Sequence, residues 1–463
     1  MRRYKLILIM LIIIGNLFGY SVMDRIAGNY TGNLDPRSAA MGSAAASGGN
    51  RFFDSLINPA NLSFLPGTLG VQLNTTVMVT SENRSLPMYN SFDAYIDDAT
   101  YVSNSNYYPD ISLGAYYKKS MQDIQIAAGL SFYPYLSFDS NYDEQVRNNA
   151  NSDYNNYPPI IARNSLEGDG TVYAYDLAVA VSYREFISLG LEIAKLSGET
   201  KLKRKINWSD QAFDMTSEGE LSDTLNTLNR DFDGLKFTIG ARTKINSRLG
   251  VGFAYTPKIE FDLKGKADGT DLDEAVYIYY ARFDSLQNLQ ISDSLTFADF
   301  NSPARLRSGF SWEPRNIMRT YLNCDFEYVW WSDANKIFAD VMNYYIGVEH
   351  RFSNHLPLRI GFNYQTSYSV EWDSGIAFAQ KITEPTFTLG TGFTFMDRFE
   401  FDFSLSYCNR KYETLDLFQD SFYDYEDLWA NYYYLNLEDR GWENPDTVKE
   451  NFYKFIAAVN YNW

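Results

Sequence analysis

Charged side chains recur at every second position in several segments of this sequence. Arg305 and Arg307, for example, lie on either side of Leu306 and share one face of any extended strand, because alternate residues of a strand point to opposite sides. A guanidinium group presents paired N–H donors that match a carboxylate, so arginines on such a face can bind a carboxylate in a bidentate manner. We predict this role for Arg305 and Arg307, with Arg242 as a third candidate.

The same alternation places further charged residues on this face. Buried charges need partners, so we expect most of them to pair with one another or with another part of the chain. The predicted set comprises Lys236, Arg242, Lys244, Arg305, Arg307, Arg319, Arg359, Asp325, Glu327, Glu349, Glu400 and Asp402.

Other chemistry has little support in the sequence. Hydrolases commonly use histidine as a base, but His350 shares a face with apolar residues and His355 lies in a predicted turn. Cys324 falls on an apolar face and Cys408 on a polar one, so a disulfide is not expected. We predict no enzyme, no cofactor and no metal site. The formal net charge of −18, without a basic patch, argues against nucleic acid as a partner.

The elements that position these residues are strands. Apolar residues alternate with polar or small ones in fourteen segments, which is the spacing of β-strands with one apolar face. The segments are 68–82, 111–119, 123–138, 171–184, 186–203, 234–246, 248–264, 304–313, 317–331, 340–352, 356–370, 384–396, 398–414 and 451–463.

The connections between these segments are alternately short and long. An even number of strands with short turns at one end and long polar loops at the other is typical of a transmembrane β-barrel. We therefore predict an all-β fold, a 14-stranded antiparallel transmembrane β-barrel. A large soluble β-sandwich or propeller is the alternative, because it would also bury one apolar face. The long loops are 83–110, 139–170, 204–233, 265–303, 332–339, 371–383 and 415–450.

The N-terminal sequence predicts that the protein is exported from the cytoplasm. A basic start, "MRRYK", precedes the apolar run "LILIMLIIIGNLF" and the small-residue stretch "GYS", as in a secretory signal peptide. We expect residues 1–21 to be removed, with cleavage before Val22. Residues 22–67 are rich in Ala, Ser and Gly and contain an Asn-Pro corner, which favours a hatch inside the lumen of a barrel formed by residues 68–463. A flexible periplasmic tail is the alternative for residues 22–67.

The segment "RSAAMGSAAASGGNRFFDSLINPANLSFLPG" (37–67) resembles the N-terminal hatch of the FadL/TodX-type outer-membrane transporters of long-chain fatty acids and hydrocarbons, with the signature Asn58, Pro59 and Ala60. Residues 234–267 are similar to that family's central hairpin, and "SPARLRSGFSW" (302–312) resembles the strand that follows. The acidic stretch that usually precedes Asn-Pro-Ala is replaced by "SGGNRFFDSL". The resemblance implies capture of a hydrophobic ligand by external loops, passage into the lumen and sideways exit through a kinked third strand.

The third predicted strand, "DIQIAAGLSFYPYLSF", contains Gly129 and Pro134. Proline cannot donate to a strand ladder and glycine weakens one, so we predict an unpaired gap in the wall at these residues. The alternative is that Pro134 only marks the external end of the strand.

Two long loops contain apolar residues at helical spacing. We predict that they form amphipathic helices whose stripes line a capture groove for an apolar ligand. The alternative is that the stripes pack on each other or on the barrel rim, because a stripe indicates burial without identifying the partner. The predicted groove residues are Leu272, Val276, Tyr279, Phe283 and Leu286 in the loop 265–303, and Leu221, Leu225 and Leu228 in the loop 204–233.

These observations predict a monomeric, multi-pass protein of a Gram-negative outer membrane. It would be inserted by the barrel assembly machinery, surrounded by lipid and lipopolysaccharide, and would take up long-chain fatty acids or apolar hydrocarbons by passive transport. The alternative is a PorV-type barrel that shuttles proteins in the type IX secretion system, with the aromatic loop 415–450 as a docking surface. The acidic stretch "DSFYDYEDLW" (420–429) favours a solvated loop over a Ca²⁺ or lipopolysaccharide bridge, because no ligand spacing repeats.

Overall fold

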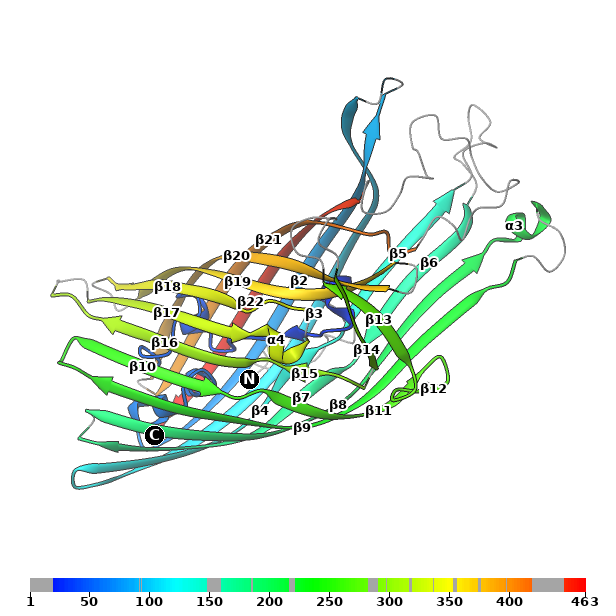
Figure 1. Cartoon of the computed structure of the whole chain (residues 1–463). Helices are drawn as coiled ribbons and strands as arrows, with labels where there is room; N and C mark the ends of the chain where they lie inside the picture. Colours follow the sequence, from blue (N-terminus) through cyan, green and yellow to red (C-terminus); the bar gives the residue numbers. More distant parts are fainter. Residues whose placement is uncertain are drawn as a thin grey trace, which may run out of the picture.

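Fourteen long strands close into one antiparallel barrel, in which each wall strand pairs with the wall strands before and after it (Figure 1). The fold class and the strand number predicted from the sequence are thereby confirmed. In chain order the wall strands are β2 (Leu69–Tyr89), β3 (Tyr95–Met121), β4 (Ile124–Ser137), β7 (Thr171–Tyr183), β8 (Ile187–Trp208), β9 (Thr224–Lys244), β10 (Leu249–Thr256), β16 (Ala304–Trp312), β17 (Thr320–Trp330), β18 (Val341–Arg351), β19 (Pro357–Asp373), β20 (Ile376–Phe395), β21 (Phe399–Thr414) and β22 (Asp446–Asn462).

This computed structural model describes residues 20–90, 92, 94–147, 160–184, 186–215, 221–281, 290–296, 298–315, 319–335, 337–352, 356–373, 376–396, 398–418 and 445–463. No helix within these ranges is long and apolar enough to cross a bilayer.

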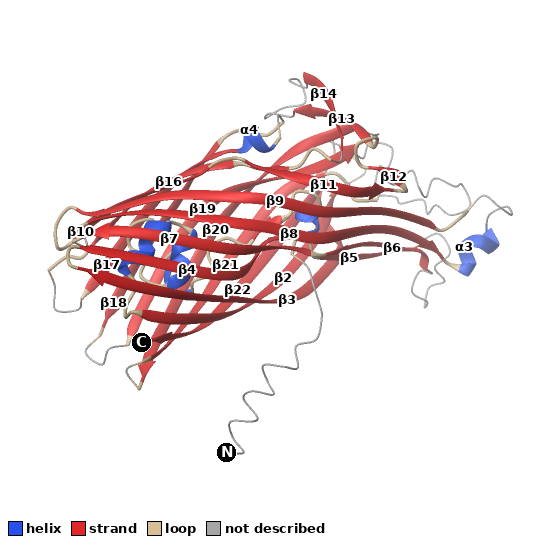
Figure 2. Cartoon of the chain, turned by 90° about the horizontal axis from the view of Figure 1, so that it is seen from below, coloured by secondary structure: helices blue, strands red, loops and turns tan. Residues whose placement is uncertain are grey.

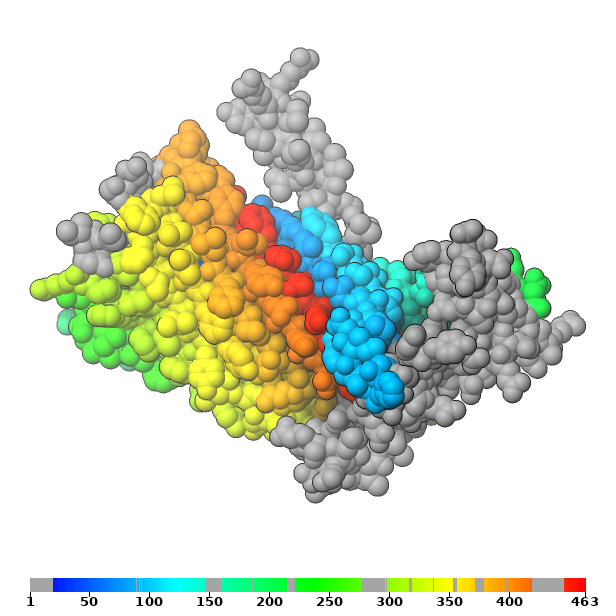
Figure 3. All heavy atoms as spheres, turned by 90° about the horizontal axis from the view of Figure 1, so that it is seen from above, coloured from blue at the N-terminus to red at the C-terminus, as the bar shows by residue number. Residues whose placement is uncertain are grey.

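The barrel closes where its last strand meets its first. β22 pairs with β21 on one edge and with β2 on the other, so that Val459 faces Phe401 and Leu73 across the two ladders. At the chain end, the Trp463 amide donates to the Leu69 carbonyl over 2.7 Å. Figure 3 shows this seam, with the red β22 between the orange β21 and the blue β2. Closure leaves no wall strand with a free edge at the seam, as hydrocarbon requires.

Alternation separates an apolar outer surface from a polar lumen. On β7 and β9, the outward residues Leu177 and Ile239 expose 47% and 57% of their surface, whereas their neighbours Asp176 and Thr238 expose 3% and 1%. The predicted inward set is buried or half-buried with one exception, Arg319, which is exposed. Arg319 lies in the turn before β17 with a backbone φ of 44°, so the alternation of the strand does not extend to it.

The segment before the barrel runs through its lumen. It consists of short elements, η1 (Val22–Arg25), β1 (Asn29–Tyr30), α2 (Pro36–Ala39), η2 (Phe52–Leu56) and η3 (Pro59–Phe64). Figure 2 shows helical turns of this segment, hereafter the hatch, inside the ring of strands. Most of its side chains are buried, which a free periplasmic tail would not be.

Several long polar connections contain strands that the sequence did not predict. β2 and β3 extend far into the predicted loop 83–110, and the predicted loop 139–170 contains β5 (Ser140–Arg147) and β6 (Ile160–Asp169). Beyond the apolar belt both faces of a strand meet water or a polar lumen, so the alternation that reveals a strand disappears. The remaining elements are α3 (Asp210–Met215), β11 (Ile259–Ala267), β12 (Thr270–Asp271), β13 (Val276–Ala281), β14 (Gln290–Thr296), β15 (Asn301–Ser302) and α4 (Trp331–Ala334).

Replacing Ile346 by arginine tests the lipid-facing surface. Ile346 is half exposed in the middle of β18 and faces Cys324 and Phe362 across its two ladders. A charge at this depth is expected to lower the free energy of unfolding by about 2–4 kcal/mol. Urea unfolding in lipid vesicles measures the change. Arginine at the exposed turn residue Ser247 is the control, and an equal loss of stability in both variants would contradict the assignment.

Candidate functional site

The Asn-Pro-Ala corner fixes the hatch against the wall. Asn58 caps η3, and its Oδ1 accepts a hydrogen bond from the Ala60 amide at 3.1 Å. Its Nδ2 donates to the Ala46 carbonyl at 2.6 Å and to the wall carbonyl of Ala241 at 3.1 Å. Pro59 occupies the first helical position, where its missing N–H costs nothing. The signature therefore ties two hatch segments and the wall at one point.

The wall uses glycine where the hatch backbone approaches most closely. A Cβ added to Gly240 of β9 would lie 2.0 Å from Asn58 Oδ1, and one added to Gly361 of β19 would lie 2.0 Å from the Gly42 amide nitrogen. No real Cβ sits that close to another atom, so these positions admit only glycine unless the hatch moves. The inward row of the wall is thus shaped to fit the hatch.

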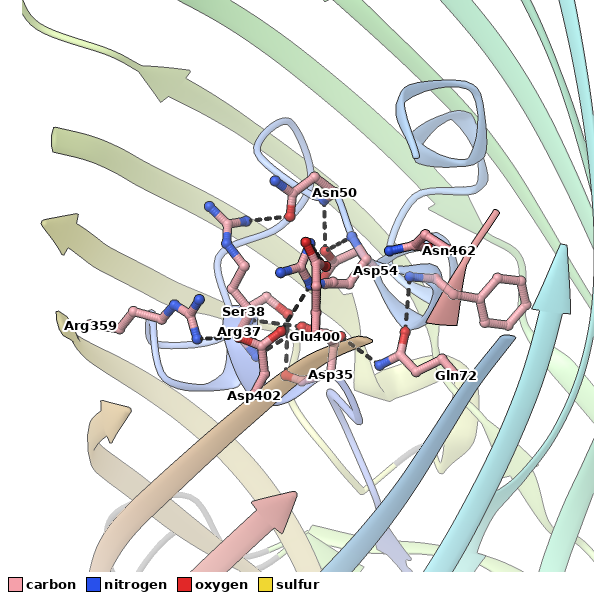
Figure 4. A network of polar contacts seen from close by, with 12 residues as sticks. Asp35, Arg37, Ser38, Asn50, Asp54, Gln72, Arg359, Glu400, Asp402 and Asn462 are labelled. Atoms are coloured by element: carbon pink, nitrogen blue, oxygen red, sulfur yellow. Dashed lines mark hydrogen bonds and ion pairs between the residues drawn. The ribbon is translucent and has the colours of Figure 1, made fainter. Parts of the chain in front are cut away.

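A chain of buried ion pairs anchors the hatch to β18, β19 and β21. Arg37 Nε lies 2.8 Å from Glu349 Oε2, which also accepts from Arg359 Nε at 2.7 Å. Arg359 Nη1 continues to Asp402 at 2.6 Å, and Asp402 returns to Arg51 of the hatch at 2.9 Å. Figure 4 shows Arg37, Arg359 and Asp402 gathered around the hatch ribbon. Each charge is paired and hydrogen-bonded, which is the condition for burying it.

Asp35 of the hatch lies beside this chain. Its Oδ1 accepts from the Arg37 and Ser38 amides and caps α2, and its Oδ2 accepts from Gln72 of β2 at 2.8 Å. Burial, together with the nearby carboxylates of Asp54 and Asp402, raises the pKa of Asp35 to about 7.

A second anchor centres on Asp325 of β17. Its Oδ2 accepts from the Ala45 and Ala46 amides of the hatch at 2.8 and 2.9 Å, and from Arg307 Nε at 2.9 Å. Arg307 in turn donates to the Ser43 carbonyl and lies 3.9 Å from the centre of the Tyr345 ring. The donors of Arg307 are therefore used largely by the wall and the hatch.

Arg242, the third predicted carboxylate ligand, is also committed to the hatch. It donates to the Gly49 carbonyl at 2.6 Å and to Asn61 Oδ1 at 3.0 Å, and it stacks on Phe64 at 4.0 Å. Arg305 differs, because it lies over the Tyr30 ring at 4.5 Å and reaches Glu327 only at 3.7 Å. Carboxylate binding stays a prediction for all three arginines, and among the described contacts Arg305 has no ion pair shorter than 3.7 Å.

Above the anchored part of the hatch, the lumen contains a cavity of about 270 Å³. Its lining mixes apolar residues such as Ile26, Leu136 and Phe338 with polar ones, including Arg305 and Gln365. Lys454 also lines it, donating to the Thr31 carbonyl at 2.7 Å, and within the described ranges no carboxylate lies within ion-pair distance of its Nζ. The cavity can therefore hold a molecule with an apolar body and a polar or anionic end.

The wall ladder is open between β3 and β4. These strands pair from Met121↔Ile124 as far as Leu113↔Phe132, beyond which β3 pairs only with β2. β4 continues along β7 with a bulge between Pro134 and Leu136 and bends onto the hatch, where Leu136 pairs with Tyr30 of β1. Thr31 Oγ1 donates to the Pro134 carbonyl at 2.5 Å. The unpaired stretch predicted at Pro134 is present, and β4 does not end there.

Gly129 has a different role from the predicted one. It pairs with Tyr116 on β3 and with Ala178 on β7, so the ladder is intact at this position and the prediction of a gap there is wrong. A Cβ at Gly129 would lie 2.6 Å from the ring of Phe52, a hatch residue that stacks on Tyr116. The glycine makes room for the hatch.

The two predicted amphipathic helices are absent from the described ranges. Leu225 and Leu228 lie on β9, one exposed and one buried, while Leu221 precedes that strand. Leu272 follows β12, and Val276 and Tyr279 lie on β13, which pairs with β14 and β20. Phe283 and Leu286 lie outside the described residues. A helical spacing in a tyrosine-rich and β-branched stretch was outweighed by cross-strand pairing, as short apolar runs allow.

Two features of the site were missed. Lys454 lies in "NFYKFIAAVNYNW", where alternation alone places it inward. Nothing in the sequence indicates that its Nζ bonds to hatch carbonyls. Tyr20 lies within the predicted signal peptide and is buried against the gap. Only the folded chain shows that this residue packs against β3.

The sequence pattern of one protein family, described as outer membrane protein transport protein (OMPP1/FadL/TodX), matches residues 35–422. The chain belongs to this family. It is accordingly a multi-pass protein of the Gram-negative outer membrane. No curated protein is similar enough in sequence to count as a match.

Solved structures of the family share the fold. A Pseudomonas aeruginosa FadL homologue is 12% identical with a TM-score of 0.56, and the alignment covers 94% of this chain and 100% of that one. The toluene transporters TodX of P. putida and TbuX of Ralstonia pickettii are 16% and 15% identical to this chain. Each has a TM-score of 0.53, and each alignment covers 95% of this chain and 99% of the transporter. At such identities the likeness establishes architecture and leaves the cargo open.

Changing Asp325 to asparagine tests the second hatch anchor. The substitution keeps the shape but leaves the buried guanidinium of Arg307 without its carboxylate. We expect the free energy needed to open the hatch locally to fall by about 3–5 kcal/mol. Faster hydrogen exchange at the Ala45 and Ala46 amides, with unchanged strand content, is the measurement. The control is Glu260→Gln on β11, whose side chain is 78% exposed, and equal exchange in the two variants would contradict the anchor.

Proposed function

We propose that this protein lets hydrophobic small molecules cross the outer membrane passively, and that they leave the lumen sideways through the opening between β3 and β4. One observation supports this more than any other. The wall ladder is interrupted beside an internal cavity, at the point where the hatch holds β4 away from β3. Membership of a family of outer-membrane transport proteins is consistent with the proposal.

The axial route is closed in this conformation. The hatch fills the periplasmic half of the lumen, with its backbone against wall glycines and its charges paired to wall residues. A molecule that descended along the axis would have to displace this packing. Sideways exit needs only a change at the β3–β4 opening, and it delivers an apolar molecule to hydrocarbon without a passage through water.

The chemistry of the cavity favours an amphipathic cargo over a purely apolar one. A chain of methylene groups suits residues such as Leu136 and Phe338, while Arg305 and Lys454 provide cationic donors for a carboxylate. A long-chain fatty acid combines both parts. A hydrocarbon such as toluene, named for the TodX and TbuX transporters, would leave the two cations unused.

The external loops differ from the sequence expectation. The described residues of the loops 204–233 and 265–303 do not form the predicted helical groove, and most of the loop 415–450 lies outside the described residues. The alternative of a PorV-type protein shuttle is not favoured, because the family match is to transport proteins and the lumen contains a cavity suited to a small molecule. The reading as a transport channel requires no catalytic group.

Closing the β3–β4 opening with a cross-link should block transport. In a background without the native cysteines, Ile111→Cys on β3 and Pro134→Cys on β4 would be joined by a cleavable bifunctional maleimide in outer-membrane vesicles. We expect uptake of a radiolabelled long-chain fatty acid to be largely lost on cross-linking and regained on cleavage of the linker.

The matched control joins two strands that are already paired. Leu130 on β4 faces Leu177 on β7, and both side chains point outward. A cross-link between cysteines at these positions should leave uptake unchanged. If the double-cysteine variant transports before cross-linking, equal uptake with and without the β3–β4 cross-link would exclude lateral release through this opening.

Replacing Arg305 by methionine tests the nature of the cargo. Loss of one charged hydrogen bond is expected to weaken binding of a fatty acid by about 1.5–3 kcal/mol, roughly tenfold to hundredfold. Binding of the alkane of equal length should not change. Titration calorimetry of the detergent-extracted protein measures both, with Arg398→Met in an exposed turn as the control. Equal losses for the two ligands would show that Arg305 acts on packing and not on a carboxylate.

A further inference from the structure

The first described residues of the chain are packed inside the barrel. Tyr20 and Ser21 expose only 5% and 3% of their surface. Ser21 caps η1 by accepting from the Met23 amide at 3.1 Å, and its hydroxyl donates to Glu450 of β22. A cleavage before Val22, as expected from the sequence, would remove both residues, leaving η1 uncapped and Glu450 without this donor.

Tyr20 spans the opening between β3 and β4. On one margin, its backbone nitrogen donates to the carbonyl of Asp139, two residues beyond the end of β4. On the other margin, its ring stacks on Tyr108 of β3 with 5.6 Å between centroids, and its hydroxyl donates to Asp110 Oδ2 at 3.2 Å. A single residue therefore joins the two strands where they no longer pair with each other.

The surroundings of Tyr20 are rich in negative charge. Asp139 is buried and accepts from Ser137, Gly170 and Thr171, while Asp110 accepts from the Tyr20 hydroxyl. Burial, and after it the charges of Asp110 and Asp139, raise the pKa of the Tyr20 phenol well above its usual value. The positive charge of Lys454 also acts on Asp110, but the Lys454 Nζ donates hydrogen bonds to the carbonyls of Thr31 and Asn33. A positive charge at the Tyr20 nitrogen would be stabilised here.

We propose that the mature protein begins at Tyr20 and that its N-terminal ammonium group is a structural cation bridging the margins of the wall opening. An export-associated signal peptidase would hydrolyse the Gly19–Tyr20 amide with one water molecule. The hydroxyl goes to the Gly19 carbonyl carbon and a proton goes to the Tyr20 nitrogen. Gly19 supplies the small residue that such an enzyme requires next to the cut, directly after the apolar run.

Processing at this bond changes the opening electrostatically. The Tyr20 nitrogen is a neutral amide with one N–H before cleavage. Afterwards it is an amine with an ordinary pKa of about 7.7–8.0, mostly protonated at neutral pH and with three N–H donors. One donor continues to the Asp139 carbonyl, and the positive charge offsets the carboxylates of Asp110 and Asp139. The opening is thus held closed by a group that exists only in the exported protein.

The proposed cleavage at Gly19–Tyr20 does not depend on the proposed transport function. Only the role of the ammonium group in cargo release rests on that function. Mass spectrometry of the intact, detergent-extracted protein and sequencing of its N-terminal peptide give the first test. We expect the chain to begin at Tyr20. A chain that begins at Val22 or later overturns the inference, yet leaves lateral release through an unplugged opening intact.

The second test measures the pKa of the terminal amine by acetic anhydride labelling of the folded protein over a pH series. A bridged ammonium group should have a pKa raised by about one unit or more, which lowers its reactive neutral fraction about tenfold near neutral pH. Asp110→Asn should remove most of this rise. The control is Asp123→Asn, an exposed carboxylate paired with Arg184 in a turn at the barrel's other end. An ordinary pKa that is indifferent to Asp110→Asn contradicts the bridging role.

Discussion

A peptide group in hydrocarbon finds no water to bond, and the architecture of this protein follows from that constraint. An unpaired strand edge is costly at membrane depth, so the sheet closes through β22 and β2. Side chains at successive positions of a wall strand then point alternately to the lipid and to the lumen. Ile346 and Leu177 lie on the lipid side, whereas Asp176 and Asp325 lie inside.

Because charges gather in a narrow lumen, the hatch is held by electrostatics as much as by packing. Glu349 and Asp325 each bind both a wall arginine and a hatch group. Charges with this many partners are costly to separate, and they tie the hatch to the wall. Arg305 and Lys454 are satisfied less completely, and they line the remaining cavity. Arg305 and Lys454 thus lie in the part of the lumen that the hatch leaves unfilled.

One break in the wall ladder lies where the hatch competes with β3 for the edge of β4. β1 takes that edge at Leu136, and Thr31 bonds the Pro134 carbonyl. Tyr20 contacts the edge of β3 that no longer pairs with β4, by stacking on Tyr108 and donating a hydrogen bond to Asp110. An opening that is unpaired in the backbone but bridged by one aromatic residue is a low-stability element within a rigid barrel. Such elements are the ones from which moving parts of proteins are drawn.

The sequence by itself determined the barrel, its strand number and the direction in which most side chains point. Strands that alternate apolar and polar residues can cross a membrane only as a closed barrel with the apolar side chains facing lipid. It also located the Asn58 corner and the interruption at Pro134. Tertiary structure decided the rest, since contacts between distant segments leave no local pattern. Arg242 and Arg307 bind the hatch, and Gly129 accommodates Phe52. Leu225, Leu228, Val276 and Tyr279, expected on helices, lie on strands. Each outcome depends on what lies across the lumen or the ladder.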